Sequence, residues 1–245
     1  MKSINSIFTF CALFCLVTMV KAQDKKDYPV LPFNKLIVSP YINVVLREGA
    51  EEKVEISSRK VDERDIHVDI DGQTLRIYLE GSRLRPRNVS KNGMNTERYR
   101  DAEITAYVTY KNLKKLSVRG DQRVVCESSL KGKRFKLKTF GDNQVMLTGV
   151  ETDFFKASMY GDNRVEIDGG RSQKQKYLSF GDNKVYARHY EADFTKTTSF
   201  GDGEFFFNTK DVIKVVAFGD ADIQYSGGAY LERGLILGDS DIRSR

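Results

Sequence analysis

The chain has 245 residues and a formal net charge of +6, with 40% hydrophobic and 30% charged residues and no tryptophan. This hydrophobic share is low for a thick globule and fits an elongated body with a large surface. Only two histidines occur, and no nucleophile motif, phosphate-binding loop or metal-ligand spacing is present. The composition therefore argues against an enzyme, whose active site needs one singular constellation of reactive groups.

Residues 1–22 are predicted to be a signal peptide. Lys2 gives a positive start, an apolar run follows over residues 7–20, and Val20 and Ala22 place small side chains at the −3 and −1 positions of a cleavage site. The alternative is a membrane anchor, but a spanning helix needs roughly 20 apolar residues. We therefore expect an exported protein, periplasmic, on the outer-membrane surface or extracellular, with no membrane span after cleavage and no nucleic-acid partner.

Cleavage changes the cysteine content and the charge of the chain. Cys11 and Cys15 leave with the signal peptide, so Cys126 alone remains and no intrachain disulfide can form. Loss of Lys2 and Lys21 lowers the formal net charge from +6 to +4. Residues 23–31 are predicted to be a polar linker. The basic segment 82–100 is predicted to be a solvated loop, with an anion-binding arm as the alternative.

Residues 32–110 alternate between apolar and polar side chains, the pattern of half-buried strands. No stretch has helical periodicity over three turns. We therefore predict an N-terminal β region that continues or caps the structure that follows. The apolar positions of its strands are Leu36 and Val38; Ile42, Val44 and Leu46; Val54 and Ile56; Ile66, Val68 and Ile70; Leu75, Ile77 and Leu79; Ile104, Ala106 and Val108.

Residues 111–245 contain a repeat that is marked by a Gly-Asp pair at spacings of 21, 20, 20, 20, 18 and 19 residues. Repeats of this length indicate stacked units, each of which completes its core against its neighbours. The seven pairs are Gly120 and Asp121, Gly141 and Asp142, Gly161 and Asp162, Gly181 and Asp182, Gly201 and Asp202, Gly219 and Asp220, and Gly238 and Asp239.

Aligning the copies on glycine gives apolar columns that are predicted to face inward. Cys126 belongs to the second column, so we interpret it as a buried hydrophobic residue. Four residues after glycine stand Val124, Val145, Val165, Val185, Phe205, Ile223 and Ile242. Six residues after glycine stand Cys126, Leu147, Ile167, Ala187, Phe207 and Tyr225. Four residues before glycine stand Leu116, Leu137, Ala157, Tyr177, Thr197 and Val215.

These patterns predict an all-β fold, a right-handed parallel β-helix or β-solenoid with coils of about 20 residues. Columns of like residues are what stacking of one coil on the next produces. The alternative is an antiparallel meander with one hairpin per copy.

The Gly-Asp pair, often followed by Asn, is predicted to form the corner of each coil. Glycine takes positive φ without steric cost, and Asp and Asn side chains accept hydrogen bonds from backbone N–H groups two residues on. Stacked carboxylates repel one another, which hydrogen bonds could offset. We therefore predict structural turns and no cofactor or metal, with calcium bound along the Asp column as the alternative.

Two further columns are predicted from the same alignment. Five residues before glycine stand the cations Lys115, Lys136, Lys156, Lys176, Lys196, Lys214 and Arg233, expected to face solvent. They keep the sheet soluble, or they form a cationic stripe for an anionic polymer. One residue before glycine stand the aromatics Phe140, Tyr160, Phe180, Phe200 and Phe218. Either these rings form an exposed stack or they turn into a corner of the core.

Several segments resemble a known family. They are Phe33–Val38 with Ile42–Leu46, Leu113–Val118 followed by the Gly-Asp turns, and the ending Gly219–Gly227. Over roughly residues 33–245 the chain resembles the putative auto-transporter adhesin, head GIN domain family. The resemblance implies an exported β-helical protein of Gram-negative bacteria that carries no catalytic residues. The family usually turns through Ser-Gly-Ser-Gly-Asp, whereas here Thr139 and Phe140 precede Gly141.

The function predicted from these features is a non-enzymatic, adhesin-like binding module that acts through its flat faces on glycans or other cell-surface polymers. The main alternative is a structural envelope protein that assembles into homo-oligomers. A polysaccharide-acting enzyme is the third reading, because some parallel β-helices place acids and bases on one face.

Overall fold

The computed structural model describes residues 25–82, 99 and 101–245. The predicted signal peptide and nearly all of the basic segment 82–100 lie outside these residues. Part of the predicted linker is not a linker, because β1 (Lys25–Tyr28) pairs antiparallel with β4 (Lys53–Arg59). The polar side chains of β1 are largely exposed, which explains why its sequence lacks the alternation of a half-buried strand.

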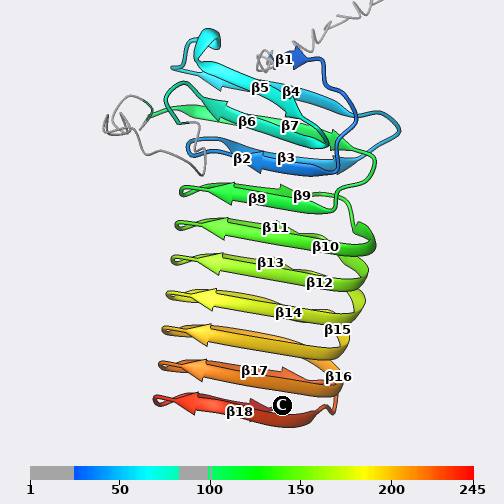
Figure 1. The fold of residues 1–245 in the computed structure, drawn as a ribbon, viewed down its shortest axis with the longest axis vertical. Coiled ribbons are helices and arrows are strands. Elements are labelled where there is room, and N and C mark those ends of the chain that lie inside the picture. The colour runs from blue at the N-terminus through cyan, green and yellow to red at the C-terminus, as the bar shows by residue number, and fades with distance from the viewer. Residues whose placement is uncertain (1–24, 83–98, 100) are drawn as a thin grey trace, which may run out of the picture.

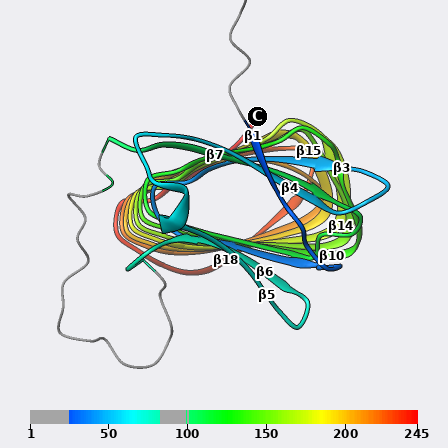
Figure 2. The same ribbon diagram turned by 90° about the horizontal axis from the view of Figure 1, so that it is seen from above.

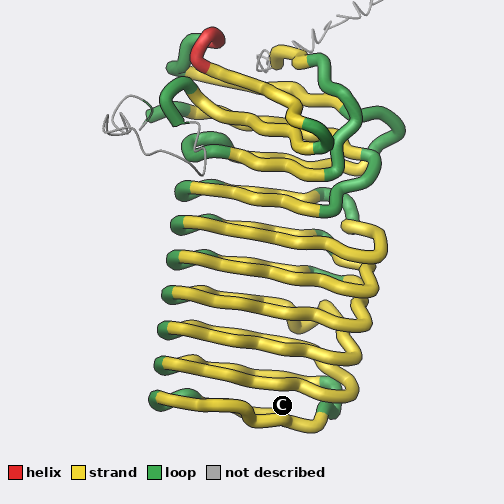
Figure 3. Tube along the Cα trace, in the orientation of Figure 1, coloured by secondary structure: helices red, strands yellow, loops and turns green. Residues whose placement is uncertain are grey.

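The described part of the chain is nearly all β, with 70% of its residues in strands. The helical content of the described residues is one short 3-10 segment, η1 (Glu63–Asp65). Figures 1 and 3 show the strands lying across an elongated stack, with tight turns along one edge and broader bends along the other. Figure 2, viewed from above, shows a flattened ring of superimposed coils.

The Gly-Asp repeat forms a parallel β-solenoid of coils about 20 residues apart, which confirms the predicted fold class. Every strand of the repeat pairs in parallel with its neighbours in the stack, so the alternative of an antiparallel meander is wrong. From β8 downward the chain runs along one sheet, turns at Gly-Asp and returns along the other, in a right-handed sense (Figures 1 and 2).

The first sheet ends at the Gly-Asp turns, and the second sheet begins after them. The first consists of β8 (Lys115–Arg119), β10 (Leu130–Phe140), β12 (Val150–Tyr160), β14 (Gly170–Phe180), the later parts of β15 (Asn183–Phe200) and β16 (Gly203–Phe218), and β18 (Tyr230–Leu237). The second consists of β9 (Arg123–Cys126), β11 (Gln144–Leu147), β13 (Arg164–Ile167), the early parts of β15 and β16, β17 (Ala221–Ser226) and β19 (Asp241–Ser244).

The N-terminal region both continues the stack and caps it. Its strands are β2 (Lys35–Val38), β3 (Asn43–Glu48), β4, β5 (Ile66–Asp71), β6 (Thr74–Leu79) and β7 (Glu103–Tyr110). Strands β2 and β3 form a coil that pairs in parallel with β8 and β9 below and with β6 and β7 above. Antiparallel pairing of β4 with β7 and β5 with β6 then ends the stack. The order of coils in space therefore differs from their order in the chain.

The core is built from columns of like residues in consecutive coils. Pairing joins Val124, Val145, Val165 and Val185 in register, and each is at most 1% exposed. Cys126 is fully buried in the next inward column, opposite Leu147. Burial raises the pKa of its thiol, which keeps the sulfur in the neutral form of a buried hydrophobic residue.

Candidate functional site

The Gly-Asp corners stack with their backbones in close contact. All seven glycines have positive φ, between 96° and 126°. A Cβ added at Gly161 would lie 2.5 Å from the carbonyl oxygen of Gly141 in the preceding coil, and Gly181 stands in the same relation to Gly161 at 2.6 Å. The corner thus needs glycine for its conformation and for the approach of the next coil.

The Asp column next to these glycines bonds between coils. The sequence predicts that each Asp side chain accepts a hydrogen bond from the backbone N–H two residues further along the chain. Instead, the Asp side chain accepts from the backbone N–H of the Asp in the next coil. Asp142 donates to Oδ1 of Asp121 at 3.4 Å, and Asp239 donates to Oδ1 of Asp220 at 3.0 Å. Within the described part of the chain, no three His, Cys, Asp or Glu side chains gather where a metal ion could be held.

A buried asparagine ladder supports the central corners. The side-chain N–H of Asn143 donates to Oδ1 of Asn163, and that of Asn163 donates to Oδ1 of Asn183, both at 3.0 Å. The backbone N–H groups of Asn143 and Asn163 donate to the same oxygens at 3.2 and 3.0 Å. The ladder ends at Asn183, whose side chain donates to Oγ of Ser179 at 2.8 Å, because the next position in register is Gly203.

The aromatic column lies on the outer face of the first sheet as a continuous stack. Of the two predicted placements, the structure has the outward one, with the rings partly exposed and Phe180 37% exposed. Ring centroids are 5.0, 5.2, 4.8 and 4.7 Å apart in order along the stack, and adjacent planes differ by at most 6°. The stack consists of Phe140, Tyr160, Phe180, Phe200 and Phe218.

Residues of other types continue this column beyond both ends of the stack. The Arg119 guanidinium lies 5.1 Å from the centroid of Phe140, a cation–π contact at the N-terminal end. At the other end Leu237, 55% exposed, pairs with Phe218. Sequence reasoning missed both, although each occupies the position directly before a Gly-Asp pair.

The lysine column lies on the same outer face as the ring stack, and one column separates the two. That intermediate column consists of Lys138, Ser158, Leu178, Thr198 and Val216. Strand pairing places Lys136, Lys156, Lys176, Lys196 and Lys214 in one row. The same pairing extends the row to Lys115 on β8 and Lys35 on β2.

The predicted column is wrong at its last member. Glu232 lies opposite Lys214 and forms an ion pair with it, whereas Arg233 lies opposite Val215. Strand β18 has one extra residue between Arg233 and Ile236, so counting back five residues from Gly238 arrives one position too late.

A third column, on the other side of the lysines, was missed by sequence reasoning. It stands seven residues before glycine in the regular copies, and the Arg134 guanidinium in it lies 5.1 Å from the ring of Phe154. We call the outer surface that extends from this third column across the lysines to the ring stack the lysine face. The members of the third column are Arg134, Phe154, Lys174, Phe194, Val212 and Tyr230.

The outer face of the second sheet has a different character. Tyr186 and Phe206 stack at 5.2 Å, with Arg164 4.2 Å from the first ring and Arg188 3.9 Å from the second. On this face Arg164 forms an ion pair with Glu166, and Lys184 forms one with Glu204. A cavity of about 260 Å³ on this face is lined by Arg164, Glu166, Ile167, Asp168, Tyr186, Arg188 and His189.

No helix among the described residues has the length and apolar character required to cross a membrane. No curated protein matches the sequence.

Solved structures share the fold. A putative adhesin from Bacteroides fragilis superposes with a TM-score of 0.73 at 18% identity, covering 92% of this chain and 98% of its own. A putative adhesin from Parabacteroides merdae gives 0.64 at 16% identity, covering 91% and 95%. A putative lipid binding protein from Parabacteroides distasonis gives 0.65 at 14% identity, covering 91% and 96%.

A family model described as putative auto-transporter adhesin, head GIN domain, matches residues 32–229. The match includes the N-terminal β region and most of the solenoid, with all Gly-Asp corners except the last. The chain therefore belongs to the putative auto-transporter adhesin, head GIN domain family.

Proposed function

We propose that the protein is an exported, non-enzymatic binding module that holds glycans or similar cell-surface polymers on its lysine face. The observation that carries the proposal is the continuous, half-exposed ring stack on the same face as an unbroken row of lysines. Flat rings present apolar area to the apolar faces of sugars, and ordered exposed apolar surface of this kind marks interaction sites. The family name supports an exported or surface location and an adhesive role.

The uniformity of the face favours binding over catalysis. The lysine column and the ring stack present the same kinds of group to solvent in successive coils, which suits a polymer with its own repeat. A reaction would require a single place where acid, base and substrate meet. The repeating columns offer the same lysine and ring in coil after coil, so the reading as a polysaccharide-acting enzyme has less support.

Removing two central rings should weaken glycan binding. We expect the variant with Tyr160→Leu and Phe180→Leu to bind about tenfold less tightly or worse, about 1.4 kcal/mol, because leucine keeps apolar area but lacks a flat face. The measurement is retention on a glycan array, followed by titration calorimetry with the retained glycan. The control variant carries Tyr186→Leu and Phe206→Leu, which removes a stacked ring pair from the opposite face.

Thermal melting of both variants checks that they fold. Unchanged binding by a folded Tyr160→Leu and Phe180→Leu variant would exclude the ring stack as the glycan platform. Equal losses in the two variants would mean that the effect is not specific to the lysine face.

Self-assembly is the second candidate function, and the last coil supports it. Tyr230, Leu235 and Leu237 on β18 are 72%, 56% and 55% exposed, and β18 pairs on one side only among the described residues. An open strand edge with exposed apolar side chains can pair with another copy. Light scattering should give a defined oligomer that Leu235→Lys and Leu237→Lys together dissociate; a monomer at all concentrations would remove this candidate.

A further inference from the structure

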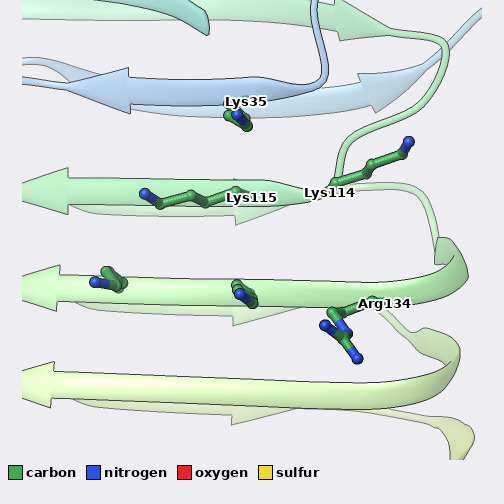
Figure 4. Close-up of a pocket in the computed structure, with 6 residues that line it drawn as sticks. Lys35, Lys114, Lys115 and Arg134 are labelled. Carbon is green, nitrogen blue, oxygen red and sulfur yellow. The ribbon is translucent and has the colours of Figure 1, made fainter. Parts of the chain in front are cut away.

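A pocket at the N-terminal end of the lysine face is lined by cations only. It has a volume of about 390 Å³ and lies where the coil formed by β2 and β3 meets β8 and β10 (Figure 4). Arg134 and two lysines come from β10, and the others come from β2, from β8 and from the residue before β8. The lining residues are Lys35, Lys114, Lys115, Arg134, Lys136 and Lys138.

The charge of this pocket is not neutralised by the protein. None of the six cations forms an ion pair with a carboxylate of the described residues, whereas elsewhere Lys184 pairs with Glu204 at 2.8 Å and Lys214 pairs with Glu232. Strand pairing places Lys35 and Lys136 on either side of Lys115, and like charges in such positions destabilise a sheet. A bound anion would remove that repulsion.

The titration of Lys115 reflects the same crowding. Partial burial, followed by the charges of Lys138, Lys35 and Lys136, lowers the pKa of this lysine. The crowding therefore arises where three strands, β2, β8 and β10, place their lysines together at this end of the face.

The pocket is a singular feature of an otherwise repetitive surface. In the coils below, the position of Lys138 is taken by Ser158 and then by Leu178. The position of Arg134 is taken by Phe154. Lys35 comes from β2, which belongs to the N-terminal region and pairs with β8. Six cations therefore line one pocket here, and the lower coils do not repeat the arrangement.

The geometry points to a further binding site, which rests on the proposed function: we propose that this pocket binds sulfate or phosphate groups carried by a glycan chain. Arginine presents a planar fork that suits the oxygens of such groups, and lysine ammonium groups bind them as point charges. A pocket of this volume is large enough for a small ligand. Lys138 stands two residues before Phe140, so a chain anchored in the pocket would continue along the ring stack.

The test compares charged and neutral glycans of the same backbone. Titration calorimetry with the purified protein should show binding of dextran sulfate, of phosphorylated dextran or of both, and much weaker binding of unmodified dextran. The variant with Lys115→Gln and Lys136→Gln should bind the charged glycan about tenfold less tightly or worse, because two pocket cations are lost. The control variant, with Arg123→Gln and Lys184→Gln, loses two cations of the second sheet, outside the lysine face, and should change by less than about threefold.

Comparison of dextran sulfate with phosphorylated dextran shows which of the two anionic groups the pocket prefers. Tighter binding of either than of unmodified dextran supports the proposed site. Equal losses in the two variants would overturn the proposal, because the effect would then be one of net charge. Failure to bind either charged dextran more tightly than the neutral one would also overturn it, and retention of neutral glycans on the array would leave the proposed function standing. Thermal melting controls for folding, and the pocket variant is expected to be at least as stable as the native protein because repulsion is relieved.

Discussion

Replacing Gly161 by alanine should lower the free energy of unfolding by about 3 kcal/mol or more. The residue has a φ of 106°, which an L-side chain rarely adopts, and its new Cβ would lie 2.5 Å from the Gly141 carbonyl oxygen. Backbone atoms cannot move aside as a flexible side chain would, because both coils are held by parallel pairing on either side of the corner. The coils must therefore separate locally or the corner must change its conformation.

The matched control for Gly161 is Gly228→Ala. Gly228 also has a positive φ, 82°, but among the described residues no atom beyond its chain neighbours would lie within 4 Å of its new Cβ. Its cost is therefore that of the left-handed conformation alone, about 1–2 kcal/mol. Urea denaturation followed by circular dichroism measures both variants. Equal losses of stability would show that contact between stacked corners is not what requires glycine at Gly161.

Replacing Asn163 by alanine should cost about 2–4 kcal/mol. Asn163 is 1% exposed, and its Oδ1 accepts hydrogen bonds from the backbone N–H and the side-chain N–H of Asn143. Its own side-chain N–H donates to Asn183. Alanine would leave the buried backbone N–H of Asn143 without its acceptor and would remove one hydrogen bond each from the side chains of Asn143 and Asn183. A buried donor that is left unsatisfied has lost its hydration without compensation. The coil after that of Asn183 forms its corner with Gly203 at this position, so a corner does not require asparagine. The predicted loss of stability therefore comes from the hydrogen bonds that are lost.

The comparison variant for Asn163 is Gln144→Ala on the neighbouring strand β11. Gln144 is exposed, so its replacement should change the free energy of unfolding by no more than about 0.5 kcal/mol. Both variants are measured by the same urea denaturation. A loss at Asn163 no larger than that at Gln144 would mean that the ladder contributes nothing to stability.

The solenoid itself was predictable because each coil stacks on a near copy of itself. In-register stacking places the same repeat position at the same place in every coil. An alignment on Gly-Asp therefore predicts which residues of neighbouring coils are in contact. The pairing of Val124 with Val145 and of Lys136 with Lys156 follows from this rule. The rule breaks at Arg233, where the extra residue in β18 shifts the count, since a bulge leaves no mark in a column of charged residues.

The candidate site was only partly predictable. The rings and lysines of the repeat were identified from their spacing, but their placement depended on how the strand meets the corner. Period-two alternation directs Phe140 outward if the strand continues to the glycine and inward if the turn begins earlier. The strand continues, since β10 extends to Phe140 itself. The side of the sheet on which the ring lies is therefore decided by the last residue of the strand.

By itself, the sequence determined the repeat length, the glycine corners, the inward columns and the family, because these depend on contacts between equivalent positions of neighbouring copies. Only the tertiary structure decided the antiparallel cap, the placement of β2 and β3 between β7 and β8 in the stack, and the cationic pocket. These features bring together residues such as Lys35 and Lys115, which are 80 positions apart and share no repeat. Alternation shows that a strand has a buried side but does not identify its neighbour, and the Gly-Asp corner likewise shows how a coil turns without showing which coil lies above the first.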